Sequence, residues 1–109
     1  MLAVWRVRRY YSGMWYTYII ECDNGQLYTG ITTDVERRWR EHCQGKAGAR
    51  FFRTSAPRKL CRVEPYQDRS SASKREAAIK KLSRPQKLKL LSSDSPLPVP
   101  ALSPACRAQ

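Results

Sequence analysis

The chain has 109 residues, enough for one domain with a single hydrophobic core. It carries 21 Lys and Arg against 9 Asp and Glu, a net charge of +12, and 41% of its residues are hydrophobic. No apolar run approaches the roughly 20 residues that a membrane-spanning helix needs, so an integral membrane protein is excluded. A charge excess of this size favours a polyanionic partner, nucleic acid rather than an anionic membrane.

Charge and composition divide the chain into three zones. Residues 1–13 form a basic N-terminal extension, whereas residues 14–91 hold 17 Lys and Arg and 8 Asp and Glu. Residues 92–109 are neutral and contain four prolines and four serines, a composition that opposes helix and sheet alike. We therefore predict a folded domain over 14–91 and a disordered tail over 92–109.

The four cysteines are far apart in the sequence and are accompanied by a single histidine, His42. The sequence contains no Cys-x-x-Cys pair, and tetrahedral zinc sites use three or four Cys and His ligands, usually in close pairs. A disulfide framework is also disfavoured because no secretory signal is present. These features predict reduced thiols in a cytoplasmic protein.

The first predicted element is a β-hairpin. Residues 15–21 are rich in aromatic and β-branched side chains, which predicts a strand. Residues 23–25 (Asp-Asn-Gly) predict a tight turn, and residues 26–31 predict the second, antiparallel strand. A two-residue turn would place Tyr18 and Tyr28 on opposite faces of the hairpin. A three-residue loop with a left-handed glycine would place them on the same face, and the sequence leaves both registers open.

A capping box, Thr33-Asp34-Val35-Glu36, predicts a helix over residues 34–44 that begins at a Thr33 cap and stops at Gly45.

The spacing within this helix places Val35 and Trp39 on its buried edge. Arg38 and His42 are also four residues apart, so they should project together beside that edge.

The second half of the chain predicts one strand and two helices. The strand covers residues 60–63 and ends at Pro65, and a helix runs from Ser70 or Ser71 to Leu82. Ser83 then caps a last helix that has Pro85 in its first turn, with three leucines available to pack. The order is ββαβαα, an α+β fold with a small three-stranded antiparallel sheet flanked by helices.

Glu76 is the most informative single residue. It falls in an inward stripe with Ala72, Ile79 and Ser83, at the 4, 3, 4 spacing of a buried helix face. A carboxylate there is costly unless a cation or hydrogen bonds satisfy it, and Mg²⁺ often needs only one protein carboxylate plus water and phosphate. The alternative is a local surface pair with Lys80.

Four further residues could bind a phosphate or transfer a proton. The planar guanidinium of Arg38 can donate hydrogen bonds to two phosphate oxygens at once, and a histidine such as His42 ordinarily titrates near neutral pH. The phenols of Tyr18 and Tyr28 can act on a water or a leaving oxygen. Each also has an ordinary interpretation, as a solvated arginine, a packed histidine or strand-forming tyrosines.

The residues as a set resemble the GIY-YIG nuclease domain. The two tripeptides of that motif stand here as Tyr16-Thr17-Tyr18 and Tyr28-Thr29-Gly30, followed by Arg38, His42 and Glu76. The stretch from Tyr28 to Arg38 is especially similar to small stand-alone bacterial members, and the resemblance covers residues 14–91.

The resemblance implies metal-dependent phosphodiester hydrolysis. Glu76 would bind one Mg²⁺ or Mn²⁺, and Arg38 would stabilise charge on the scissile phosphate. Tyr18 would help to activate the attacking water, with Tyr28 and His42 in the same site. It also favours the three-residue hairpin loop.

The leading hypothesis is a divalent-metal-dependent endonuclease that acts on DNA rather than RNA, structure-selective or weakly sequence-specific. A non-catalytic nucleic-acid-binding module of the same fold is the alternative, and an adaptor that uses the Pro-rich tail is the third. Basic and aromatic side chains are expected to contact the nucleic acid: Arg37, Arg40, Lys46, Arg50, Phe51, Arg53 and Lys80.

Overall fold

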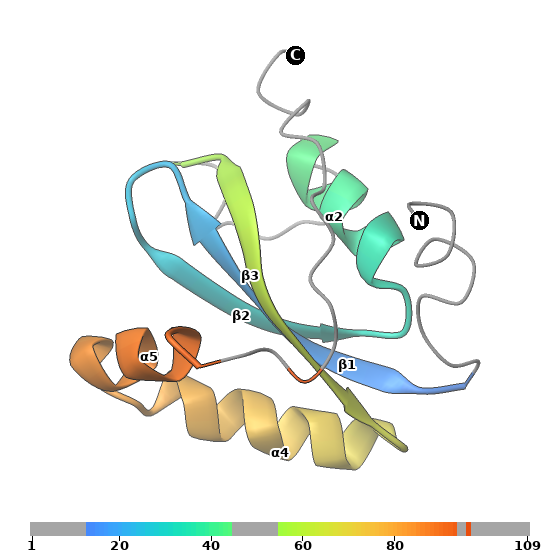
Figure 1. The fold of residues 1–109 in the computed structure, drawn as a ribbon. Coiled ribbons are helices and arrows are strands. Elements are labelled where there is room, and N and C mark those ends of the chain that lie inside the picture. The colour runs from blue at the N-terminus through green and yellow to red at the C-terminus, as the bar shows by residue number, and fades with distance from the viewer. Residues whose placement is uncertain (1–12, 45–54, 94–95, 97–109) are drawn as a thin grey trace.

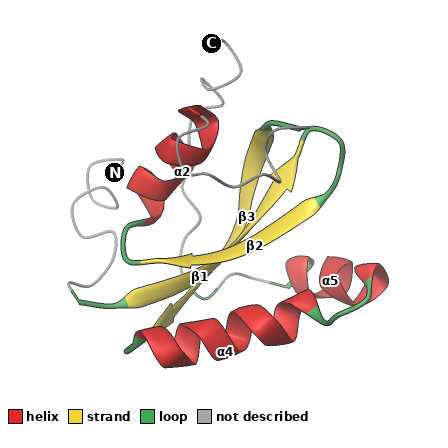
Figure 2. Ribbon diagram, turned by 180° about the vertical axis from the view of Figure 1, so that it is seen from behind, coloured by secondary structure: helices red, strands yellow, loops and turns green. Residues whose placement is uncertain are grey.

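The computed structural model describes residues 13–44, 55–93 and 96. The elements in chain order are β1 (Trp15–Cys22), β2 (Leu27–Thr32), α2 (Val35–Gln44), β3 (Pro57–Tyr66), α4 (Arg69–Lys80) and α5 (Arg84–Leu91). The predicted ββαβαα order and three-stranded antiparallel sheet are confirmed, with strand order β2-β1-β3. Helix α2 covers one face of the sheet, and α4 and α5 lie on the other (Figures 1 and 2).

The hairpin uses the three-residue loop. Gly25 has a φ of 88°, its N–H donates to the carbonyl of Cys22, and the N–H of Cys22 donates to the carbonyl of Gln26. A positive φ costs glycine nothing, because it has no Cβ. This loop pairs Ile20 with Tyr28, so the two tyrosines of interest share one face of the sheet.

The central strand β1 faces two different layers. Tyr16, Tyr18 and Ile20 belong to a buried core cluster with Val35 and Trp39 of α2. The alternate residues point to the other face, as expected for a strand.

Toward the second layer, the hydroxyl of Thr17 donates to the carbonyl of Ala72 in α4 at 2.9 Å. The sheet is therefore enclosed between α2 and α4, and each side chain of β1 is assigned to one of the two.

Strand β3 is longer than predicted. Residues 60–63 form only its middle, and the strand continues through Pro65, which pairs with Tyr16, to Tyr66. Pro65 was predicted to end the strand, and this prediction was wrong. Because β3 is an edge strand, a residue without an N–H does not interrupt the sheet there.

Two helix starts differ from the prediction. The Oδ1 atom of Asp34, not Thr33, caps α2 by accepting from the N–H of Arg37 at 3.0 Å. Asp34 is held in place because its own N–H donates to the Thr32 hydroxyl at 3.0 Å. Helix α4 begins after an Asp68 cap rather than at Ser70 or Ser71.

The predicted start of the last helix is confirmed. Ser83 and Gln86 form a reciprocal capping box at the N-terminus of α5, with a proline in the first turn. Helix α4 ends at Lys80, so Ser83 belongs to the next cap and not to an inward stripe of α4. The leucines of α5 pack only in part, since none is buried and Leu88 is 46% exposed.

Two further expectations concern the membrane and the cysteines. Within the described ranges, no helix has the length and apolarity that crossing a membrane requires. Among the described cysteines, Cys22, Cys43 and Cys61 are not joined by disulfides.

Candidate active site

The centre of the candidate site is a hydrogen bond between Tyr18 and His42. The phenol oxygen of Tyr18 lies 2.9 Å from Nε2 of His42, and each residue is 2% exposed. Tyr18 reaches this position because alternate side chains of β1 face α2, and His42 lies in the last turn of that helix. Two residues 24 positions apart are thus brought into one buried pair.

Tyr28 completes an aromatic cluster with this pair. Its ring centroid lies 6.2 Å from that of Tyr18 and 5.3 Å from that of His42, the latter in an edge-on arrangement. Such edge-to-face packing is favourable for aromatic rings at these separations. The three-residue hairpin loop is the reason that both phenols lie on the α2 face.

Gly30 provides the space in which Tyr18 lies. A Cβ atom built on Gly30 would be 2.6 Å from the hydroxyl oxygen of Tyr18 and 2.8 Å from its Cζ atom. The phenol therefore crosses directly over the Gly30 backbone, which only a residue without a side chain allows. Sequence reasoning assigned no role to Gly30, although its place opposite Tyr18 in the three-residue-loop register indicated the contact.

Arg38 lies one helical turn before His42 on α2. Its Nη1 atom is 3.1 Å from Oε1 of Glu41, and its guanidinium lies near enough to Tyr18 for each group to shift the pKa of the other. The buried Nε–H of Arg38 has no hydrogen-bond partner within the described part of the chain. A donor that remains unsatisfied beside the phenol is well suited to an added phosphate oxygen.

Burial keeps both members of the central pair neutral. It lowers the pKa of His42 to about 4, and the positive charge of Arg38 adds to this effect. Burial also raises the pKa of Tyr18, and the neighbouring Tyr28 raises it further. At neutral pH, the site therefore combines a neutral imidazole, a protonated phenol and one permanent cation.

The lowered pKa of His42 predicts that acid destabilises the fold. The unfolded chain takes up a proton near pH 6.5, whereas the folded protein resists it until about pH 4. The contribution of His42 is thus fully present above pH 6.5 and is lost as the pH falls toward 4, a difference on the order of 3 kcal/mol. We expect the unfolding free energies of wild type and His42→Gln to converge over this range in denaturant titrations. A constant difference between them would contradict the prediction.

Glu76 comes from the opposite layer. The buried residues of α4 are Ala72 and Ile79, whereas Glu76 lies beside that stripe, with its side chain 22% exposed and Oε2 2.9 Å from Nζ of Lys80. Of the predicted inward stripe, Ala72 and Ile79 are buried and Glu76 is only partly buried at its edge. The surface pair with Lys80, the alternative from sequence, is present.

A buried ionic cluster fixes the rotation of α4. The Glu64 carboxylate on β3 accepts from Nε of Arg62 at 2.6 Å, from Nε of Arg75 at 2.8 Å and from the Tyr66 hydroxyl at 2.8 Å. Burial opposes ionisation of Glu64, but these three hydrogen bonds lower its pKa on balance. Nothing in the sequence pattern singled out this cluster.

The cluster also determines where Glu76 lies. At about 100° per residue, Arg75 and Glu76 flank the buried stripe of α4 on opposite sides. Because Arg75 reaches β3, Glu76 lies on the flank away from β3, and α4 packs under β2 as well as β1. The edge strand β2 is the strand that carries Tyr28.

The Glu76 carboxylate, as a single protein ligand, fits a divalent cation whose other ligands are mostly water molecules. Over the residues that the structure describes, no group of three His, Cys, Asp or Glu could hold a metal ion. A single carboxylate with only Oε2 paired to Lys80 leaves a hard oxygen for Mg²⁺ or Mn²⁺, which bind through one or two carboxylates plus substrate phosphates.

The predicted nucleic-acid contacts are only partly visible. Arg37 and Arg40 are exposed on α2, with Nε of Arg37 3.9 Å from Oε2 of Glu41, and Lys80 is held by Glu76. The remaining four lie outside the described residues: Lys46, Arg50, Phe51 and Arg53.

Comparison with known proteins identifies a family and several relatives. The family model described as the GIY-YIG catalytic domain matches residues 14–89. The UPF0213 protein XAC3202 of Xanthomonas axonopodis pv. citri is 44% identical over 72% of this chain and 76% of its own length. The UPF0213 protein DP2720 of Desulfotalea psychrophila is 48% identical over 72% of each chain.

A solved structure is also similar in sequence. It is the solution structure of the UPF0213 protein BH0048 from Bacillus halodurans, 40% identical, which covers 72% of this chain and 83% of that one with a TM-score of 0.48. With its two tyrosines, arginine and histidine assembled on one face of the sheet, and with the family model matching most of its length, the chain belongs to the GIY-YIG family.

Proposed function

We propose that this protein is a divalent-metal-dependent endonuclease that hydrolyses phosphodiester bonds in DNA. The observation that carries the proposal is the 2.9 Å hydrogen bond between the Tyr18 hydroxyl and Nε2 of His42, beside the guanidinium of Arg38. A buried phenol and a neutral imidazole form a proton path, and the adjacent cation can receive a phosphate. Membership of a family with a catalytic domain supports the same conclusion.

The residues divide the reaction between them. Tyr18 can accept a proton from a water at its hydroxyl oxygen while it passes its own proton to the neutral His42. The planar fork of Arg38 can bind two oxygens of the scissile phosphate and stabilise the charge that develops there. Glu76 would hold one Mg²⁺ or Mn²⁺, which when bound supplies further neutralisation of phosphate charge.

Substitution of Arg38 tests this assignment. We expect Arg38→Lys to reduce cleavage by about 10²-fold or more while DNA binding changes little, because an ammonium group cannot reproduce the two-point fork. The measurement is single-turnover cleavage in Mg²⁺ across linear, flapped and branched DNA, with binding measured in EDTA.

The matched control is Arg58→Lys. Arg58 is also an arginine paired with a carboxylate, Glu21, at 2.8 Å, but it lies on β3 away from the tyrosines. Cleavage by this variant should equal that of wild type. If Arg38→Lys also cleaved at the wild-type rate, the role given to Arg38 would be refuted.

A non-catalytic nucleic-acid-binding module is the second candidate. The observation in its favour is that Oε2 of Glu76 is already paired with Lys80, on α4, which lies on the face of the sheet opposite to α2 (Figure 1). Such a module would bind the linear, flapped and branched DNAs without metal and cut none of them. Metal-dependent nicking of any substrate would exclude it.

A further inference from the structure

Within the domain, most of the excess positive charge belongs to one layer of the fold. Residues 69–91, which we call the α4–α5 layer, contain eight Lys and Arg and one carboxylate, Glu76. Residues 14–68 contain nine Lys and Arg and seven Asp and Glu. The layer is on the face of the sheet opposite to α2 (Figures 1 and 2), so its own excess charge lies across the sheet from that helix.

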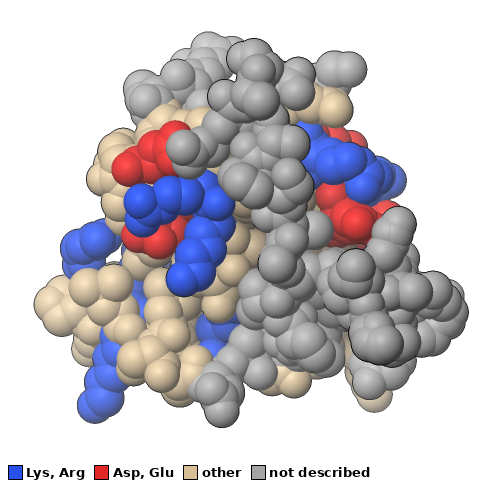
Figure 3. All heavy atoms as spheres, turned by 45° about the horizontal axis from the view of Figure 1, so that its top comes forward, with Lys and Arg blue, Asp and Glu red and all other residues tan. Residues whose placement is uncertain are grey.

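Among the described residues, four of the five arginines outside this layer have a carboxylate partner. Glu41 pairs with Arg37 and Arg38, Glu21 pairs with Arg58, and Glu64 pairs with Arg62. Figure 3 shows one face of the molecule on which basic and acidic side chains lie next to each other.

Most cations of the α4–α5 layer differ in this respect. Arg75 and Lys80 have carboxylate partners. The other six form no ion pair with a described carboxylate: Arg69, Lys74, Lys81, Arg84, Lys87 and Lys89. The charge of Lys74 nevertheless helps to lower the pKa of the nearby Asp68.

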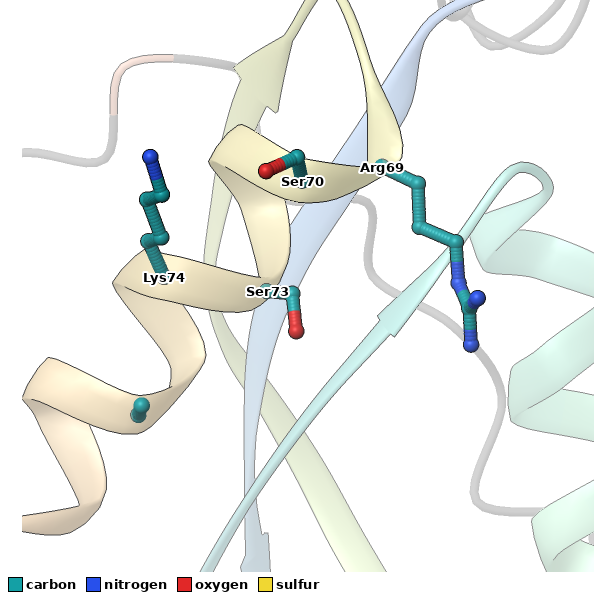
Figure 4. Close-up of a pocket in the computed structure, with 5 residues that line it drawn as sticks. Arg69, Ser70, Ser73 and Lys74 are labelled. Carbon is teal, nitrogen blue, oxygen red and sulfur yellow. The ribbon is translucent and has the colours of Figure 1, made fainter.

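On α4, the cations share the outer face with small polar residues. Spacing of about 100° per residue puts Arg69, Lys74, Lys80 and Lys81 within an arc of about 140°, turned away from the buried stripe. An open hollow on this face is lined by Arg69, Ser70, Ser73, Lys74 and Ala77 (Figure 4). Ammonium, guanidinium and hydroxyl groups are the donors that contact phosphate and sugar in nucleic-acid complexes.

The side chains around the hollow favour a nucleic acid over a membrane. Helices that lie on membranes place aromatic and large aliphatic residues opposite their charges, so that these insert between the lipids. The outer face of α4 offers serine and alanine between its cations instead. Arg69 is additionally held against the ring of Trp15, 5.7 Å from its centroid, which limits its freedom to follow a lipid surface.

We infer that the α4–α5 layer is a second backbone-contact surface, which binds a segment of the nucleic acid distinct from the one at Arg38. This inference rests on the proposed function, because that function places the first segment on the α2 face. A straight duplex cannot lie on both faces of the sheet at once. The substrate that uses both surfaces is therefore a nucleic acid that changes direction, such as a branched DNA.

Glu76 and Lys80 lie where the two surfaces adjoin. Glu76 is on the flank of α4 away from β3, and Lys80 is one turn further along, at the start of the basic outer face. A strand that passes the edge of β2 from the α2 face would meet this ion pair first and the unpaired lysines next.

The double variant Lys74→Gln/Lys81→Gln tests the inference. Binding is measured in EDTA to a three-way DNA junction and to a linear duplex of the same total length, over a range of salt. We expect the affinity for the junction to fall about 10-fold and its log–log salt slope to decrease in magnitude by about 2, since each lost phosphate contact removes roughly 0.9. Affinity for the linear duplex should fall less than about threefold, because the α2 face still binds it.

The control is Arg58→Gln/Lys59→Gln, which removes the same charge from β3. Both of these side chains are exposed, and the variant should bind both DNAs within about twofold of wild type. Equal losses on junction and duplex, or a loss no larger than in the control, would overturn the inference. So would DNA binding that is unchanged while binding to phosphatidylglycerol vesicles is lost.

The two proposals fail separately. Suppose that the wild type cuts no DNA but Lys74→Gln/Lys81→Gln loses the preference for the junction. The endonuclease assignment would then be wrong and the second surface would stand. If Arg38→Lys abolished cleavage while the layer variant bound the junction normally, the second surface would be wrong and the endonuclease assignment would stand.

Discussion

Glu76→Gln is expected to reduce Mg²⁺-dependent cleavage on the order of 10³-fold. The glutamine keeps the size of the side chain but removes the negative charge that would hold the cation, and a bound metal ion contributes several kcal/mol to the transition state of phosphoryl transfer. DNA binding in EDTA should stay within about twofold of wild type, since a carboxylate contributes nothing favourable to a phosphate. Single-turnover cleavage and a binding titration on the same DNA measure both quantities.

Glu21→Gln is the matched control for this prediction. Glu21 and Glu76 are exposed to similar extents, 26% and 22%, and each has one basic partner among the described residues, at 2.8 and 2.9 Å. Loss of either ion pair has a similar small effect on stability, so a difference in cleavage reports the metal and not the fold. Equal cleavage by the two variants would refute the role of Glu76. It would also favour the binding module.

Gly30→Ala is expected to produce the second large effect. Its Cβ would lie 2.6 Å from the Tyr18 hydroxyl oxygen, so the phenol must move away from Nε2 of His42. A displacement of about 1 Å at a reacting group can cost 10²-fold in rate, and overpacking a buried contact costs about 1–3 kcal/mol of stability. Cleavage rates and chemical denaturation of the purified variant measure these two losses.

Two companion variants separate the steric effect from a general loss of folding. Gly25→Ala also disturbs a glycine of the hairpin, but through its positive φ of 88°, and should lower stability without a comparable loss of cleavage. In Gly30→Ala/Tyr18→Phe, the closest contact is removed, so part of the lost stability should return although activity does not. If Gly30→Ala cut DNA normally, Tyr18 would not need its position over this glycine.

The sequence was sufficient for most of the local structure. The Asp23-Asn24-Gly25 turn and its flanking aromatic residues predicted the hairpin, and Ser83 with Pro85 predicted the start of α5. These features depend on interactions between residues a few positions apart, which a sequence pattern records directly. The four-residue spacing of Arg38 and His42 placed them on one helix face for the same reason.

The errors arose where two local solutions compete. Thr33 and Asp34 can both cap a helix, and Asp34 takes the position because Thr32 accepts a hydrogen bond from its N–H. Pro65 ends a central strand but not an edge strand, and only the order β2-β1-β3 shows that β3 is at an edge.

The sequence by itself determined the elements, their order, and a set of tyrosine, arginine, histidine and glutamate side chains similar to a known family. The tertiary structure decided which of these meet. It placed Tyr18 against His42 over Gly30, kept that pair neutral by burial, and set Glu76 on α4, on the face of the sheet opposite to α2. The physical reason is that periodicity encodes which face of an element is buried, whereas strand register and packing between layers bring distant residues within bonding distance.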